Sequence, residues 1–186
     1  MVKVYTQEHV FRHPWERVSA ASWRKFGDPA NRSTLSHIVE VDTVSRALDA
    51  TSGQLRSKRI ITVNTPGPWW LQRLLGQNVC HCIETSIVDA KNRSMALVSK
   101  NITLKDFVEV EEKSWLVPHP ANPQWTLSTQ ETSIRCTPLS ALASVAEKVE
   151  QRCAEKFLQN SLKGREVMER ICSFMEADTN PIGLSG

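Results

Sequence analysis

Long apolar runs are absent from this sequence of 186 residues. No stretch approaches the ~18 consecutive apolar residues of a membrane-spanning helix, so no such helix is expected. The opening residues, MVKVYTQEHVF, place charged and polar side chains where a signal peptide would have its apolar segment. They also lack the amphipathic, arginine- and serine-rich pattern of a cleaved transit peptide. We therefore expect a globular chain without a cleaved leader.

The signatures of common catalytic sites are also missing. The chain contains no GxSxG, HExxH, P-loop or GxGxxG segment, and its five histidines fall in separate segments. Glu109, Glu111 and Glu112 form an acidic run on a probable strand, which we interpret as a solvated face. With no paired acid and base apparent, an enzyme is the weaker functional class.

Cysteine is too scattered for a disulfide framework or a convincing zinc site. The five cysteines are odd in number and widely spaced. Cys80, His81 and Cys82 could form part of a metal site, but no second pair completes it. We favour buried or idle thiols, and expect neither a metal nor a cofactor.

Charge and length are those of an ordinary single domain. The net charge of +3 permits attraction to an anionic surface but does not by itself indicate nucleic acid. A chain of this length can bury about 70% of its unfolded surface in one domain. We predict a domain over residues 1–176 and a flexible tail over 177–186.

The pattern of the chain predicts one helix early, strands in the middle and one long helix at the end. Residues 2–11 read as a strand, and a helix then starts at His13-Pro14-Trp15 and ends near Phe26. Six strands follow between about 36 and 136, mostly joined by short turns. From 139 to 177 apolar residues recur at helical spacing without proline. We predict an α+β fold in which a curved seven-stranded antiparallel sheet closes against the long helix.

Polar residues interrupt the apolar stripe of the long helix. At 100° per residue one stripe contains Val149, Cys153, Lys156, Asn160, Gly164, Val167 and Ile171, with Lys163 at its edge. A buried ammonium needs an anion or water, so these lysines either face a cavity or are simply solvated. The pattern alone leaves both interpretations open.

Two strands show similar interruptions. Arg59 shares a strand face with apolar residues such as Ile61 and Val63, and His37 shares one with Val39 and Val41. An edge position or an internal salt bridge would explain them. Together with Lys25 at the end of the first helix, they would also suit a cavity that holds an anionic head group.

The segment NTPGPWWLQRLLGQ, residues 64–77, gathers apolar side chains in a probable loop. The hinge-like residues are Pro66, Gly67 and Pro68, and the apolar ones are Trp69, Trp70, Leu71, Leu74 and Leu75. A core plug, a protein-binding patch and a membrane-contacting cover all fit this pattern.

Eight segments, taken in their order and spacing, resemble the PRELI family, and more closely its slowmo-like branch. They are EHVFRHPWERV, WRKFGDP, DTVSRALDATSGQLRSKRI, PWWLQRLLG, SIVDAKNRSMAL, SKNITL, PHPANPQWT and KFLQNSLKGR, spread over about residues 1–172. The resemblance implies a START-like lipid carrier in the mitochondrial intermembrane space, peripheral to membranes, that moves phosphatidylserine or phosphatidic acid between the two mitochondrial membranes. It also implies a small helical-hairpin partner with twin cysteine motifs.

The resemblance further implies roles for particular residues. The family's head-group pocket falls on Lys25, His37, Arg59, Lys156, Asn160 and Lys163. The lid over the pocket falls on the 64–77 segment. Val63, just before it, and Pro66 stand in place of the lysines often found early in the lid. We therefore expect this lid to act through apolar contact. A START-like enzyme and an adaptor that binds no lipid are the alternatives.

Overall fold

The computed structural model describes residues 2–64, 79–106, 108–137 and 143–179, without the side chains of 143–149 and 179. Its seven strands form one antiparallel sheet in the order β1-β7-β6-β5-β4-β3-β2. The strands are β1 (Val2–Phe11), β2 (Ile38–Leu48), β3 (Gln54–Asn64), β4 (Val79–Asp89), β5 (Ser94–Asn101), β6 (Val108–His119) and β7 (Asn122–Cys136). Because β1 pairs with β7, the first and last strands of the chain lie side by side.

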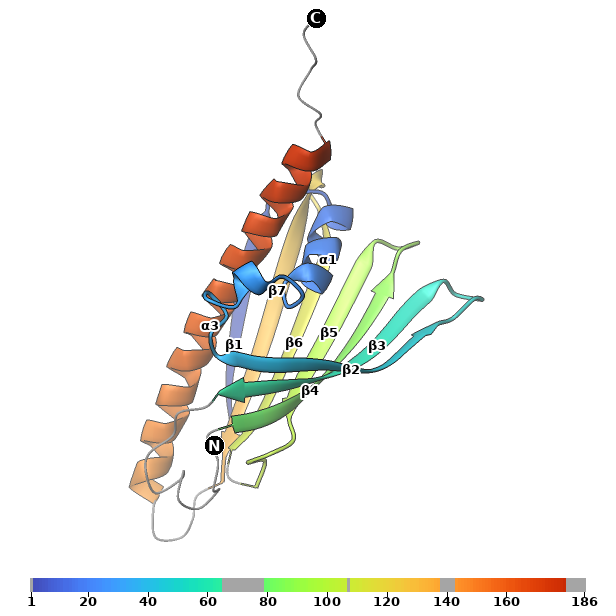
Figure 1. Cartoon of the computed structure of the whole chain (residues 1–186). Helices are drawn as coiled ribbons and strands as arrows, with labels where there is room; N and C mark the ends of the chain where they lie inside the picture. The colour runs from blue at the N-terminus through green and yellow to red at the C-terminus, as the bar shows by residue number, and fades with distance from the viewer. Residues whose placement is uncertain (1, 65–78, 107, 138–142, 180–186) are drawn as a thin grey trace, which may run out of the picture.

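The two α-helices of the described residues lie on one side of the curved sheet (Figure 1). The helix α1 (Trp15–Arg24) begins after Pro14, and a short 3-10 helix, η1 (Pro29–Asn31), follows it. The long helix α3 (Ala143–Thr179) runs along the β1 and β7 side of the sheet, while β2 to β4 lie farther from it. The strands therefore curve away from α3, with α1 in front of the sheet.

The hydrophobic core lies where α1, α3 and the sheet meet. Its fully buried members include Phe11, Val18, Met95 and Val167. The indole Nε1 of Trp15 donates to the Leu116 carbonyl oxygen over 3.0 Å, which fixes the start of α1 on β6. Burying these side chains contributes roughly 1.5–3 kcal/mol each and orients both helices on the sheet.

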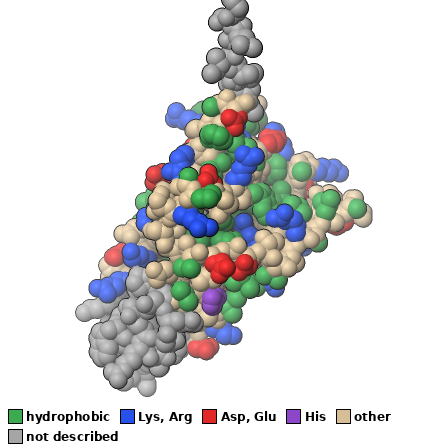
Figure 2. All heavy atoms as spheres, in the orientation of Figure 1, with side chains coloured by type: hydrophobic (Ala, Val, Ile, Leu, Met, Phe, Trp, Pro, Cys, Tyr) green, Lys and Arg blue, Asp and Glu red, His purple; other side chains and the backbone are tan. Residues whose placement is uncertain are grey.

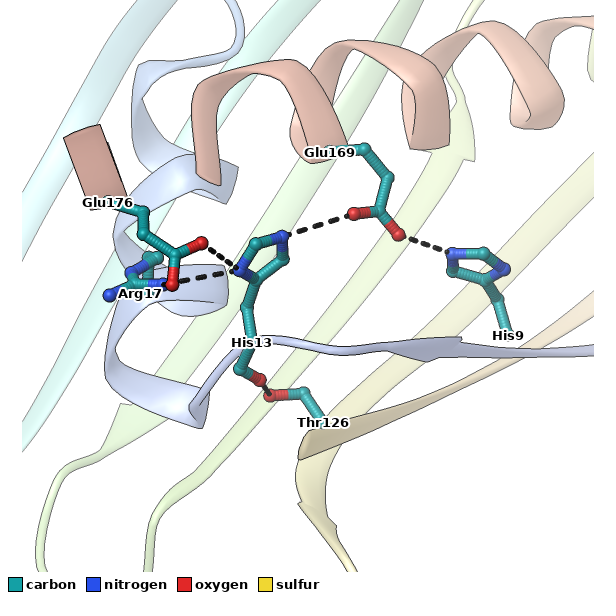
Figure 3. A network of polar contacts seen from close by, with 6 residues as sticks. All are labelled: His9, His13, Arg17, Thr126, Glu169 and Glu176. Atoms are coloured by element: carbon teal, nitrogen blue, oxygen red, sulfur yellow. Dashed lines mark hydrogen bonds and ion pairs between the residues drawn. The ribbon is translucent and has the colours of Figure 1, made fainter. Parts of the chain in front are cut away.

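A network of polar contacts joins the C-terminal half of α3 to β1 and α1 (Figure 3). Glu169 lies 3.0 Å from His9 Nε2 and 3.4 Å from His13 Nε2. Glu176 lies 3.2 Å from the Arg17 guanidinium and 3.6 Å from His13 Nδ1. Since His9 and His13 flank the end of β1, the network fixes α3 along the sheet as well as against α1.

The predicted α+β architecture is confirmed, with small differences at element ends. Strands extend further into the PHPANP segment than expected, because His119 pairs with Asn122 across a tight connection. The α3 helix continues to Thr179, past the expected tail boundary at 176. None of the described helices is long and apolar enough to cross a membrane.

Candidate functional site

A cavity of about 260 Å³ lies between the concave face of the sheet, the end of α1 and the middle of α3. Apolar side chains such as Phe26, Leu35, Ile61 and Phe157 form part of its wall. Figure 2 shows basic and acidic side chains interspersed over the face that α1 and η1 share, so this face carries no patch of a single sign. The cavity itself has an apolar wall with a few polar groups, a combination that is typical of a small-molecule site.

A polar band crosses the concave face of the sheet. Residues directly opposite each other on neighbouring strands point to the same face. One such row runs from β3 to β7 and contains Arg59, Glu84, Ser99, Glu112 and Thr132. The next row is Ser57, Ser86, Leu97, Ser114 and Gln130, in which the Ser57 and Ser86 hydroxyls are 2.7 Å apart. The floor of the cavity is therefore polar, between more apolar rows on either side.

Arg59 and Glu84 form a buried ion pair within this band. Arg59 Nε donates to Glu84 Oε1 over 2.9 Å, and the guanidinium makes a second contact with the same oxygen. The rings of Trp23 and Phe26 cover the guanidinium at 5.2 Å each. Arg59 is thus inward-facing as predicted, but its charge is neutralised by Glu84. This pair is the internal salt bridge that the sequence allowed as one explanation of a buried Arg59.

Lys25, His37 and Asn160 all line the cavity, although they come from three distant segments. The Nδ1 atom of His37 is buried and has no hydrogen-bond partner among the described residues. Burial lowers the pKa of His37, and Lys163, Lys156 and Lys25 lower it further through their positive charges. The lowered pKa favours the neutral form of His37.

The prediction that His37 shares a strand face with Val39 and Val41 is wrong. The strand begins at Ile38, so His37 precedes it, and both His37 and Ile38 line the cavity. A register shift between Ile38 and Glu40 breaks the simple alternation, and Val39 is 59% exposed. An irregular strand start of this kind cannot be deduced from period-two patterning alone.

The cavity-facing stripe of α3 is rotated relative to the predicted one. It contains Phe157, Asn160, Ser161, Gly164, Arg165 and Met168. Asn160 and Gly164 belong to both stripes, whereas Lys156 and Lys163 are exposed. These two lysines do not line the cavity, so the solvated interpretation holds for their side chains, but both remain close enough to influence His37. Further along α3, Val167 and Ile171 are buried in the core as the pattern predicts.

Glu112 and Arg165 are site residues that the sequence reasoning missed. Glu112 was interpreted as part of a solvated run, yet it lines the cavity. Its face also contains Val110 and Leu116, which are buried, so strict alternation along β6 would have predicted its direction. Arg165 follows Ser161 by one helical turn, and its guanidinium donates to Gln7 Oε1 over 2.8 Å.

The thiols Cys80 and Cys82 also line the cavity, while His81 points to the opposite face and contacts Thr62 at 3.1 Å. Strand alternation therefore separates the imidazole from the two sulfurs. Within the described residues, no group of three or more His, Cys, Asp and Glu side chains is arranged to hold a metal ion. All five cysteines are free thiols.

The predicted lid lies outside the described residues. This concerns Pro66, Gly67, Pro68, Trp69, Trp70, Leu71, Leu74 and Leu75. Its flanking residues are described: Val63 near the end of β3 and Cys80 near the start of β4 both line the cavity. The segment therefore connects two strands at the wall of the site.

Three relatives match most of the chain in sequence. The slowmo homolog of Dictyostelium discoideum is 35% identical over 164 residues, which is 88% of this chain and 68% of that protein. A UPS-like protein of Schizosaccharomyces pombe is 32% identical over 189 residues, covering 99% and 98% of the two chains. The mitochondrial protein UPS2 of Saccharomyces cerevisiae is 32% identical over 166 residues, covering 88% and 70%.

Solved structures share the fold at much lower identity. An aromatase/cyclase from Streptomyces superposes with a TM-score of 0.63 at 8% identity, covering 98% of this chain and 99% of that one. A Thermus thermophilus protein superposes with a TM-score of 0.58 at 17% identity, covering 92% and 98%. These neighbours have START/Bet v1-like folds. They confirm the predicted architecture, and at such low identity they carry no information about function. The model of the PRELI-like family matches residues 16–178, and with the relatives above it shows that this chain belongs to that family, on its slowmo-like side.

Proposed function

We propose that this protein carries an anionic phospholipid, phosphatidylserine or phosphatidic acid, between the outer and inner mitochondrial membranes. The observation that carries the proposal is the cavity between sheet and α3, where Lys25, His37 and Asn160 converge in a member of the PRELI-like family. A cation and an amide inside an apolar wall suit a phosphate attached to acyl chains. The S. cerevisiae relative is named as mitochondrial, which supports this location.

The cycle requires binding and release without making or breaking a covalent bond. The protein meets an anionic membrane surface, the lipid enters head first, and Lys25 with the surrounding lysines attracts its phosphate. For Trp69 and Trp70 we propose contact with the membrane interface, which rests on the sequence and on the preference of indole for that region. A location in the intermembrane space and a twin-cysteine partner remain proposals from the family resemblance.

A transfer assay between phosphatidylcholine vesicles that carry fluorescent phosphatidylserine or phosphatidic acid tests the function. The double change Lys25→Ala and Asn160→Ala should lower transfer about tenfold or more, because it removes a charge-assisted contact and an amide from the cavity. Lys100→Ala is the matched control, since Lys100 pairs with Glu111 outside the cavity. Trp69→Ser with Trp70→Ser should lower transfer through weaker vesicle association. Transfer by the cavity variant at the rate of the control would contradict the proposal.

A ligand-modifying enzyme is the second candidate, because the cavity contains more than cations and amides. His37 and Glu112 both line it, and together they could supply a base and an acid. The same vesicle assay separates the two functions when the acceptor lipid is analysed by mass spectrometry. Lipid recovered at unchanged mass supports a carrier, and a converted product would support an enzyme.

A further inference from the structure

The cavity contains a carboxyl group that forms no ion pair with a basic residue in the described part of the chain. Glu84 and Glu112 belong to the same cross-sheet row, two strands apart, so they are separated by roughly 10 Å. Glu84 is paired with Arg59, whereas Glu112 forms no ion pair with any described residue. The hydrogen-bonding neighbour of Glu112 is Gln130, whose side-chain oxygen accepts from Ser161 on α3 over 2.8 Å.

The surroundings of Glu112 have mixed charge. Burial raises the pKa of Glu112, and the charge of Glu84 on β4 raises it further. Lys25 at the end of α1 and Arg165 on α3 act in the opposite direction, as does the hydrogen bond with Gln130. These groups come from two helices, α1 and α3, and from two strands, β4 and β7. A head group seated here meets two cations, the Glu84 carboxyl that pairs with Arg59, and the carboxyl of Glu112.

A purely anionic head group fits this arrangement poorly. Its phosphate would gain from Lys25 and Arg165 but would meet a like charge at Glu112. A head group that also carries an ammonium satisfies both signs, since the ammonium can donate to the carboxylate while the phosphate faces the cations. The buried and unpartnered Nδ1 of His37 offers a further polar contact in the same cavity.

We propose that Glu112 binds a positively charged amine on the head group of the carried phospholipid and thereby selects amine-bearing lipids, with Lys25 and Arg165 facing the phosphate. This inference rests on the proposed carrier function. It assigns Glu112 a role in specificity. Of the two groups that serine adds to the phosphate, an ammonium and a carboxylate, Glu112 recognises the ammonium. The competing explanation is that Glu112 only completes a structural hydrogen-bond network with Gln130 and Ser161.

The test compares two lipids that differ in that charge, phosphatidylserine and N-acetyl-phosphatidylserine, in the vesicle transfer assay with the full chain. Wild-type protein should transfer phosphatidylserine about tenfold faster or more, because acetylation removes the charge-assisted contact. Glu112→Gln should lose most of that preference while retaining the shape of the side chain. Glu111→Gln is the matched control, because Glu111 lies next in sequence and contacts Lys100 at 3.3 Å on the other face.

Folding of the Glu112→Gln variant is checked by its thermal unfolding temperature, which should be no lower than that of the wild type. A carboxyl with a raised pKa in the folded state costs stability at neutral pH, and the amide removes that cost. If the wild type transfers both lipids equally, or if Glu112→Gln keeps the preference, the inference is overturned while the carrier function stands. If the wild type transfers phosphatidic acid but neither of these two lipids, the inference is overturned and the carrier function stands. If it transfers none of the three, both proposals are wrong.

Discussion

Arg59 and Glu84 show how a single buried residue depends on its partner. Their side chains are almost inaccessible to solvent, so neither charge can be hydrated if the other is removed. The sequence predicted that Arg59 points inward, from its place among apolar residues on β3. It did not predict the partner, because Glu84 is 25 residues away and becomes its neighbour only through the register of β3 with β4.

Replacing Arg59 by Met should lower the free energy of unfolding by about 3–5 kcal/mol, because Glu84 would remain charged and unpaired in the core. The second change Glu84→Leu, made in the Arg59→Met background, should recover most of this loss. Urea denaturation followed by circular dichroism measures both effects. Equal stability of the single and double variants would show that the two side chains are not coupled.

His37 should make the folded protein sensitive to mild acid. Its pKa is lowered by burial and then by Lys163, Lys156 and Lys25, so below its ordinary pKa of about 6.5 the unfolded chain takes up a proton that the folded chain resists. The free energy of unfolding therefore declines as the pH falls through that range. His37→Gln should make the decline shallower in urea titrations at several pH values. Parallel curves for His37→Gln and the wild type would contradict the assignment.

At the scale of elements, the strands were the easiest part of the fold to predict and the rotation of α3 the hardest. The six strands of the middle region are bounded by turn residues, so their limits follow from local chemistry. The face that α3 presents depends on where the curved sheet places it. Lys156 shares the predicted stripe with Asn160, yet the helix turns Phe157 and Ser161 inward instead. Helical periodicity gives the width of a stripe, and tertiary packing decides its direction.

At Gly164 on α3, the stability of the helix and the space that it leaves in the cavity can be tested separately. A Cβ atom built there meets nothing within 4 Å, so Gly164→Ala should raise the free energy of unfolding by about 0.5–1 kcal/mol through helix propensity alone. Gly164→Phe should instead occupy the cavity and lower lipid transfer without loss of helical signal. Leu162→Phe is the control, since Leu162 is exposed on the same helix. Equal transfer by the two Phe variants would show that Gly164 does not face the lipid.

At the scale of the whole molecule, the order of the strands and helices and a cavity between the sheet and the long helix were predictable, but the set of residues that line the cavity was not. Alternation and short connections indicate a meander, and the β1 to β7 pairing completes the sheet. The volume beneath α3 depends on how far the sheet curves away from the helix, a property of packing between segments more than 100 residues apart, as between Trp15 and Leu116. Glu112 belongs to the predictable part, because its alternation with Val110 and Leu116 along β6 gives its direction.

The contacts that Glu169 makes with His9 and His13 have a consequence for biogenesis. The His9 contact joins residues 160 positions apart, so α3 can dock only after nearly the entire chain is available. Contacts of such long sequence separation form late, since the loop entropy must be overcome first. A chain that emerges N-terminus first therefore completes its sheet while the concave face is still uncovered, and becomes competent to hold a ligand only when its last helix arrives.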